Sequence, residues 1–344
     1  MRINFWIPHT RVSGGVIVIL HYARELSLLG HEVTLIVESP RLIRRVVSNT
    51  LKYVPHWMRQ FGTFSIRKVK SFTYEEAYTD ADVVIADSWR CASYLTFVSK
   101  HIQKIHFIQH DERMYHGDRD LVDAVYRLPI QKIVVSTWIK DMFKRDYQYV
   151  PHVILNTVDR RIFNPKHAEN GENIRILVLD HTYAWKGTKD AIDIVHNLKK
   201  NIDKPITLVG FGSRREHAEF LYDEYHYGVS HSQLADLYSS CDVYLCTSSD
   251  EGFGLPSLEA MACGAALATY DNGGSRDFAI HNKTALVAPR LDKEALQEQL
   301  QTLVLNETIR RDVAAAGLQF VETLPTWAKQ TKKLVSFLES VHKC

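Results

Sequence analysis

Cysteine is scarce in this chain, and neither sign of charge dominates. Five cysteines occur among 344 residues, none in a Cys-x-x-Cys pair, so the sequence shows neither a disulfide framework nor a thiolate metal site. We therefore expect reduced core thiols in a cytoplasmic chain. The formal net charge of +2 and the lack of a recognisable module argue against nucleic acid as a partner.

Long apolar runs are also missing. No stretch approaches the roughly 18 to 20 apolar residues that cross a bilayer, so any membrane contact is expected to be peripheral. We interpret residues 1–9 as a short strand interrupted by Pro8, not as a signal peptide. What the chain does have is 45% hydrophobic and 24% charged residues, an ordinary balance for folded domains, and its length predicts about two of them.

Short apolar, β-branched segments alternate with helical segments, as in buried parallel sheets. The first half predicts strands at 3–7, 33–37, 83–86, 104–108, 133–135 and 153–155. After a polar stretch at 164–173 the pattern restarts, with strands at 175–179, 206–209, 243–246, 265–269 and 285–287. This pattern predicts an α/β protein with two Rossmann-like domains, 1–167 and 172–325, and ligands bound at the carboxyl ends of the strands.

The most informative segment is Glu-Gly-Phe-Gly-Leu-Pro-Ser-Leu-Glu, from Glu251 to Glu259. Gly252 and Gly254 let the loop backbone approach a ligand, and Pro256 suits the first turn of a helix, whose free N–H groups can meet an anion. Carboxylates accept hydrogen bonds from vicinal hydroxyls, which favours a sugar near Glu251 and a ribose near Glu259. The alternative is a pair of surface acids.

This segment resembles the Glu-x7-Glu signature of retaining GT-B glycosyltransferases of the family 4 type, which includes many bacterial polysaccharide enzymes. The resemblance implies that Glu251 contacts the donor sugar and that Glu259 contacts the nucleotide ribose. It assigns the loop amides of Phe253, Gly254 and Leu255 to the sugar and its phosphates.

The resemblance also implies the GT-B fold, with two Rossmann-like domains facing each other across a cleft and a C-terminal helix, 326–344, packing back on the first. The implied activity is retaining transfer of a sugar from a UDP-, GDP- or dTDP-sugar to a hydroxyl of a glycan or lipid-linked acceptor, in cell-surface polysaccharide or glycoconjugate biosynthesis. No metal and no cofactor beyond the nucleotide sugar are expected. The alternative is a catalytically idle GT-B subunit that binds a sugar nucleotide or a glycan.

Two glycine sites are candidates for donor binding. Gly14 and Gly15 stand between the first strand and a helix that ends before Gly30, where backbone amides can point at a diphosphate. A simple tight turn is the alternative. Gly212 follows a predicted strand of the second domain, in a loop expected to wrap the nucleotide.

The run Phe-Ile-Gln-His-Asp-Glu-Arg-Met-Tyr at 107–115 follows a strand, at the carboxyl end of the sheet. In related enzymes a residue here touches the donor sugar or the attacking hydroxyl, a position that suits a proton-handling group. We favour His110 over His106, because His106 lies within the strand. Catalysis and acceptor positioning both stay open for His110, and Glu112 is assigned to the acceptor side.

The segment Asp-His-Thr-Tyr-Ala-Trp-Lys-Gly at 180–187 follows the first strand of the second domain. Relatives carry an arginine and a lysine that flank the leaving diphosphate; here Lys186 matches the lysine, and His181 stands where the arginine is expected. A fixed cation stabilises the charge that grows on the β-phosphate, which histidine can do only when protonated. Either Lys186 alone holds the leaving group, or the phosphates themselves keep His181 charged. A solvated lysine at a helix start is the alternative for Lys186.

Residues 41–70 contain eight basic residues, no acidic residue and several large apolar side chains. Basic side chains are drawn to anionic lipid, and Trp and Phe insert at the interface, which favours peripheral contact with the cytoplasmic membrane face. We place Arg44, Arg45, Trp57 and Arg59 on this acceptor or membrane side. A solvated helix with an apolar core face, or a basic groove for an anionic glycan, are the alternatives.

Overall fold

The computed structural model describes residues 1–39, 41–62, 64–115, 118–166, 173–213 and 221–342. The chain forms two compact units. The N-terminal unit comprises Met1–Asn156 with Trp327–Cys344, and the C-terminal unit comprises Thr157–Thr326. The boundary that the sequence suggested, between 167 and 172, lies outside the described residues.

The segment that follows Asn156 packs within the C-terminal unit. Phe163 is buried, with its ring centroid 6.1 Å from those of both His231 and Tyr238. Lys166 forms an ion pair with Asp236. An apolar anchor and a charged contact thus attach this segment to the second unit, which begins before the polar stretch at 164–173.

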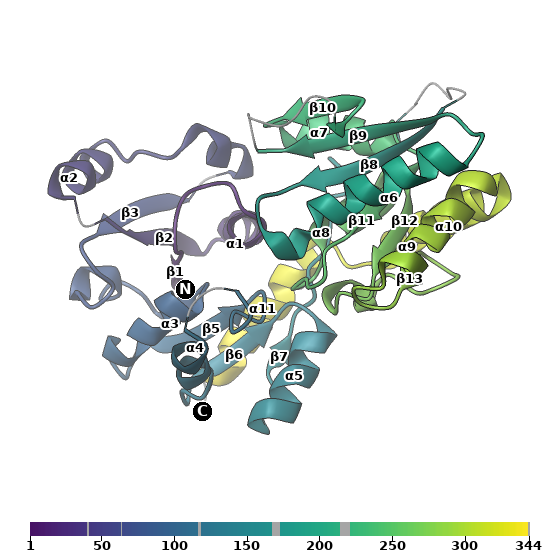
Figure 1. The fold of residues 1–344 in the computed structure, drawn as a ribbon. Coiled ribbons are helices and arrows are strands. Elements are labelled where there is room, and N and C mark those ends of the chain that lie inside the picture. Colours follow the sequence, from purple (N-terminus) through teal and green to yellow (C-terminus); the bar gives the residue numbers. More distant parts are fainter. Residues whose placement is uncertain (40, 63, 116–117, 167–172, 214–220, 343–344) are drawn as a thin grey trace. The chain divides into compact units, whose positions relative to one another are not determined.

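In the described part of the N-terminal unit, seven parallel strands form one sheet in the order β3-β2-β1-β4-β5-β6-β7 (Figure 1). Its strands are β1 (Arg2–Trp6), β2 (Glu32–Glu38), β3 (Ser65–Val69), β4 (Val83–Ala86), β5 (Gln103–Ile108), β6 (Gln131–Val134) and β7 (His152–Val153). Its helices are α1 (Gly14–Leu28), α2 (Leu42–Thr50), η1 (His56–Phe61), η2 (Glu75–Ala77), α3 (Trp89–Ser93), η3 (Tyr94–Phe97), α4 (Arg119–Tyr126), α5 (Thr137–Tyr147) and α11 (Trp327–His342).

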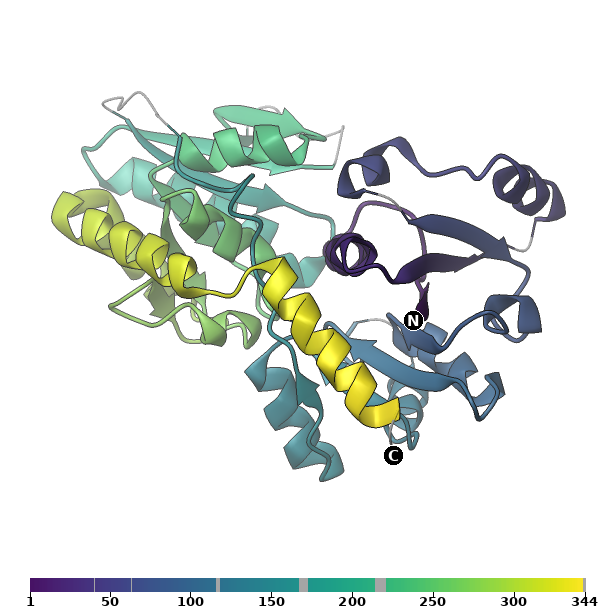
Figure 2. The ribbon, with the colours of Figure 1, turned by 180° about the vertical axis from the view of Figure 1, so that it is seen from behind.

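The last helix, α11, belongs to the N-terminal unit and lies against α1 (Figure 2). Trp327 is buried and stacks on His21 of α1, with ring centroids 4.5 Å apart and planes 3° from parallel. Further along, Phe337 stacks on His152 of β7, and the Gln330 amide donates a hydrogen bond to the Leu155 carbonyl. Aromatic stacking therefore joins the end of the chain to the sheet that its beginning forms.

The C-terminal unit has a six-stranded parallel sheet in the order β10-β9-β8-β11-β12-β13, counted over the described residues. Its strands are β8 (Ile174–Asp180), β9 (Ile206–Gly212), β10 (Glu224–Tyr227), β11 (Val243–Cys246), β12 (Ala266–Tyr270) and β13 (Leu286–Ala288). Its helices are η4 (Ala184–Lys186), α6 (Thr188–Asn201), α7 (His231–Ser239), α8 (Leu255–Ala262), η6 (Gly274–Asp277), α9 (Lys293–Leu305) and α10 (Glu307–Thr323).

The predicted α/β class with two parallel sheets is confirmed, and each predicted strand is present within a few residues. Two strands were not predicted: β3, which falls in the basic segment, and β10. No helix in the described ranges is both long and apolar enough to span a bilayer.

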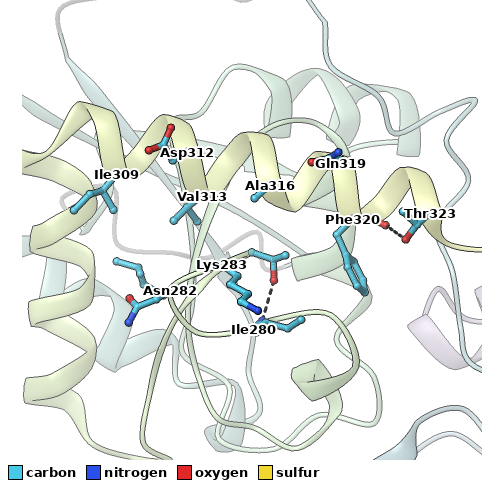
Figure 3. Close-up of a pocket in the computed structure, with 12 residues that line it drawn as sticks. Ile280, Asn282, Lys283, Ile309, Asp312, Val313, Ala316, Gln319, Phe320 and Thr323 are labelled. Carbon is cyan, nitrogen blue, oxygen red and sulfur yellow. Dashed lines mark hydrogen bonds between the residues drawn. The ribbon is translucent and has the colours of Figure 1, made fainter.

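An apolar pocket of about 730 Å³ lies in the C-terminal unit beside α10 (Figure 3). Ile309, Val313 and Phe320 of α10 line it, together with Ile280 and Leu286. None of the candidate donor-binding residues lines this pocket, so we place the functional site elsewhere in the unit.

Candidate functional site

Glu251 lies in the loop that joins β11 to α8. It is 8% exposed, and its backbone N–H donates a hydrogen bond of 2.9 Å to the Asn272 carbonyl. The next loop residues lead to Gly254, whose φ of +92° starts α8 in a conformation that favours glycine. Phe253 packs its ring against Phe278 in the core, so only its backbone is available to a ligand.

A second glycine-rich turn, which contains Gly273 and Gly274, packs against this loop. A Cβ atom on Gly274 would lie 2.6 Å from the Phe253 nitrogen and 2.7 Å from the Glu251 carbonyl oxygen. Asn272 braces the turn, because its Oδ1 accepts a 3.0 Å hydrogen bond from the Ser275 N–H. Glycine is therefore required at 274 for the two loops to approach this closely.

Lys186 is brought directly to Glu251. Its Nζ donates to Oε1 of Glu251 at 2.5 Å, and the two side chains are only 17% and 11% exposed. Gly187, at φ +66°, sets this approach, because a Cβ there would lie 2.2 Å from the Thr247 carbonyl oxygen. The Thr247 hydroxyl donates to the Gly187 carbonyl at 2.9 Å. Two residues that are distant in sequence and were predicted to serve the donor thus form one ion pair.

His181, which occupies the expected arginine position, is held through its ring. Its Nδ1 accepts a 3.1 Å hydrogen bond from the Tyr183 N–H, an arrangement in which Nδ1 carries no proton. The Tyr183 ring lies 4.5 Å from His181 and stacks on Trp185 at 4.2 Å. In this arrangement His181 offers a hydrogen-bond donor through Nε2, not a fixed charge.

Glu259 lies in α8, beyond its first turn and partly buried. Its Oε2 accepts a hydrogen bond of 3.4 Å from the Tyr238 hydroxyl. Burial raises the pKa of Glu259 to about 8, against the opposing effect of that bond. A protonated carboxyl both donates and accepts hydrogen bonds, which suits a pair of ribose hydroxyls.

Gly212 ends β9 beside the end of β8. A Cβ atom at this position would lie 2.3 Å from the Asp180 carbonyl oxygen, so the strand ends can pair here only with glycine. The packing of the sheet thus accounts for this glycine without a ligand.

The sequence did not point to Asp250 and Arg290. The Arg290 guanidinium donates to Asp250 Oδ2 at 2.7 Å and Oδ1 at 3.2 Å, and its Nε also donates to the Ser249 carbonyl at 3.1 Å. Asp250 is buried and immediately precedes Glu251. The forked contact therefore fixes the backbone that carries Glu251, and no local motif links two residues forty positions apart.

In the N-terminal unit, Gly14 and Gly15 begin α1. The Gln109 amide donates to the Gly15 carbonyl at 3.0 Å and to Asp87 Oδ1 at 2.5 Å. A Cβ on Gly15 would come within 3.2 Å of the Gln109 amide nitrogen, whereas one on Gly14 would meet nothing within 4 Å. Burial raises the pKa of Asp87, a residue the sequence did not suggest, to about 7.

Glu112 and His110 follow β5 in the same unit. Glu112 Oε2 accepts a hydrogen bond of 2.8 Å from the Trp89 N–H, and burial raises its pKa to about 8. The Tyr126 hydroxyl ties this loop together, because it donates to the His110 carbonyl and accepts from the Glu112 N–H. The His110 Nδ1 lies 3.1 Å from the Asp111 carbonyl oxygen, a distance at which it donates when protonated.

The candidate residues of the basic segment differ in their contacts. Arg44 is exposed on α2, while the Arg45 guanidinium donates to the Ser39 carbonyl and Arg59 Nε to the Val54 carbonyl. The Trp57 indole donates at 3.1 Å to the Thr10 carbonyl. This bond attaches the polar edge of Trp57 within the unit, and the membrane side of Trp57 stays a prediction.

Two sequence families match the chain. Residues 159–320 match the model for glycosyl transferases group 1, and residues 12–161 match the model for glycosyltransferase family 4. The sheets and the Glu251 loop define a GT-B type of protein. The chain belongs to the glycosyltransferases of family 4.

The chain matches only part of the length of its curated relatives. An uncharacterized glycosyltransferase of Methanocaldococcus jannaschii is 25% identical over 209 residues, covering 57% of this chain and 56% of that protein. An N,N'-diacetylbacillosaminyl-diphospho-undecaprenol alpha-1,3-N-acetylgalactosaminyltransferase of Campylobacter jejuni is 27% identical over 42% of this chain and 39% of its own. The chain thus spans about half the length, or less, of these relatives.

The solved structure of sucrose-phosphate synthase from Thermosynechococcus elongatus is similar over nearly the whole chain. Its TM-score is 0.82 at 16% identity, covering 99% of this chain and 98% of that one. At this identity the similarity shows the shared GT-B fold.

Proposed function

We propose that this chain is a retaining glycosyltransferase that moves a sugar from a nucleoside diphosphate to a hydroxyl of a glycan or lipid-linked acceptor in polysaccharide or glycoconjugate biosynthesis. The observation that carries the proposal is the ion pair between Lys186 and Glu251, in the loop just before α8, with Glu259 within that helix. Membership of family 4 supports it, and the lipid-linked substrate in the name of the Campylobacter relative supports the acceptor class.

In the proposed reaction the bond between the anomeric carbon and the phosphate oxygen breaks, and the acceptor oxygen bonds to that carbon from the same face. The acceptor proton passes to the departing diphosphate. Lys186 stabilises the growing negative charge, and Glu251 orients the sugar hydroxyls. We assign no metal to this step, because the lysine supplies a fixed cation at the site.

The placement of His181 favours one alternative, a catalytically idle subunit that binds a sugar nucleotide. Its Nδ1 accepts the Tyr183 N–H, so this residue supplies no permanent charge where relatives carry an arginine. Transition-state stabilisation would then rest on Lys186 alone. Such a subunit binds the nucleotide sugar but does not turn it over.

Thermal stabilisation by ligands separates these functions. The purified protein is screened with UDP, GDP and dTDP and their common sugar conjugates, and any ligand that stabilises it is assayed for hydrolysis and transfer. Turnover of one conjugate, lost in Glu251→Ala with nucleotide binding retained, is the expected result. Stabilisation without turnover supports the idle subunit, and no stabilisation by any conjugate overturns both.

A further inference from the structure

Helix α2 reverses the usual amphipathic arrangement. A surface helix normally turns its apolar side to the core, yet the buried residue of α2 is Ser48. Asn49 bonds to β3 through two hydrogen bonds with the Lys68 backbone, at 2.8 and 2.9 Å. The polar side of the helix therefore faces the sheet.

The apolar side of α2 faces outward. Five large apolar residues on the helix and just after it are between 50% and 80% exposed: Leu42, Ile43, Val46, Val47 and Leu51. At about 100° per residue they occupy one half of the helix surface, opposite Ser48. Both views show α2 at the outer end of the N-terminal unit, beyond the edge strand β3 (Figures 1 and 2). A clustered apolar surface of this kind marks an interaction site.

Positive charge borders this apolar side. Arg41 and Arg44 are exposed at its start, Lys52 follows its end, and no acidic residue occurs from 41 to 70. A hollow of about 280 Å³ lies among Ile43, Val47 and Leu51, with Arg44 and Lys68 also lining it. Exposed apolar side chains beside basic ones are complementary to acyl chains beneath anionic headgroups.

The apolar residues of η1, in the same basic segment, take no part in this surface. Met58 and Phe61 of η1 are buried, and Trp57 is bound to the Thr10 carbonyl. The alternative of a helix with an apolar core face therefore applies to η1 and not to α2.

We propose that α2 lies in the interface of an anionic lipid bilayer and holds the N-terminal unit on the membrane. Leu42, Ile43, Val46, Val47 and Leu51 form the inserted face, and Arg41, Arg44 and Lys52 contact lipid phosphates. This goes beyond the proposed transferase activity, since the helix would bind lipid with or without a sugar donor.

Vesicle co-sedimentation at low salt tests the proposal, with phosphatidylglycerol and phosphatidylcholine vesicles and with phosphatidylcholine alone. The double variants Ile43→Ser with Val47→Ser and Arg41→Gln with Arg44→Gln are each expected to lower binding to the anionic vesicles at least tenfold. Matched controls in the same unit are Leu28→Ser with Leu121→Ser, also strongly exposed, and Lys100→Gln with Arg119→Gln. The controls are expected to stay within twofold of the wild type.

Four outcomes overturn the proposal. In the first, the wild type does not sediment with the vesicles. In the second, the controls and the α2 variants lose vesicle binding equally. In the third, the wild type binds no vesicles and is a dimer in light scattering that Ile43→Ser with Val47→Ser makes monomeric, which assigns α2 to a second copy. In the fourth, the serine variant binds vesicles as the wild type does, and only the arginine variant weakens binding to dextran sulfate, which assigns the surface to an anionic glycan. Because the assay contains no nucleotide, failure of the transferase proposal leaves its result unaffected.

Discussion

The Nζ atom of Lys186 lies 2.5 Å from Oε1 of Glu251, and both side chains are largely buried. Each residue alone would be a costly charge to bury, but together they neutralise each other. We propose that a nucleotide sugar competes for both partners: the phosphate for the lysine and the sugar hydroxyls for the carboxylate. In that proposal the ion pair holds the two groups in place until the donor binds.

The first prediction concerns the coupling within this pair. Lys186→Met leaves a buried carboxylate without its cation. We therefore expect Lys186→Met to cost more stability in the wild type than in the Glu251→Gln variant, with a coupling free energy of roughly 1 to 3 kcal/mol. Denaturation of the two single variants and the double variant measures it. The exposed pair Arg311–Glu307 is the control, with coupling below about 0.5 kcal/mol. Equal coupling in both pairs would refute the structural role.

The second prediction concerns the nucleotide. We propose that Glu259 binds the ribose hydroxyls, so Glu259→Ala is expected to weaken binding of the nucleoside diphosphate by about 10- to 100-fold. Glu259→Gln is expected to lose less than about fivefold, because an amide resembles the protonated carboxyl that a pKa of about 8 implies at neutral pH. Calorimetric titration measures both Kd values. Equal losses in the two variants would show that the charged carboxylate is required.

The same residue predicts a dependence of stability on pH. The unfolded Glu259 carboxyl releases its proton near its ordinary value of 4.5, whereas the folded one keeps it up to about 8. Between these values the folded state binds more protons, so stability falls as pH rises. The difference in Tm between Glu259→Gln and the wild type is expected to rise, in favour of the variant, by about 2 to 6 °C from pH 5 to pH 8. Asp87 and Glu112 titrate in both proteins, so their contributions to the Tm difference cancel. A Tm difference that does not change with pH would contradict the effect of burial on Glu259.

Within the two described sheets, the sequence predicted every inner strand, and at the edges it predicted β7 and β13 but not β3 and β10. The missed strands β3 and β10 are edge strands, and Arg67 and Lys68 in the one and His226 in the other break the apolar pattern on which strand prediction depends. Edge strands tolerate such residues because only one side is paired.

For the candidate site, the sequence suggested individual residues but not the contacts between them. Local motifs led us to propose Lys186, Glu251 and Glu259, because Lys186 and Glu251 each precede a glycine and Glu259 follows Glu251 by eight positions. They did not predict that Lys186 and Glu251 would pair, nor that Arg290 would hold Asp250, since both contacts join different loops. The apolar residues of α2 and η1 look alike in sequence, and only packing separates the exposed Ile43 from the buried Phe61.

The fourth prediction tests the support beneath the Glu251 loop. Gly274→Ala places a methyl group 2.6 Å from the Phe253 nitrogen, so one of the two loops must move. We expect a loss of about 2 kcal/mol or more in stability and at least a tenfold loss in transfer. Gly14→Ala, where the methyl group meets nothing within 4 Å, is the control for stability. A stable and fully active Gly274→Ala would show that the loop positions are not critical.

The fifth prediction concerns Arg290, which contacts the backbone at Ser249 and the carboxylate of Asp250 but lies outside the motifs of the site. Arg290→Ala frees the turn that carries Glu251 and leaves the buried Asp250 without its cation. We expect kcat to fall about tenfold with little change in the KM for the donor, because the nucleotide contact proposed for Glu259 lies on a different element. Steady-state kinetics measures this split. Arg276→Ala removes the exposed ion pair with Asp271 and is expected to leave kcat unchanged. If Arg290→Ala raises KM and spares kcat, Arg290 binds the donor directly and does not position Glu251.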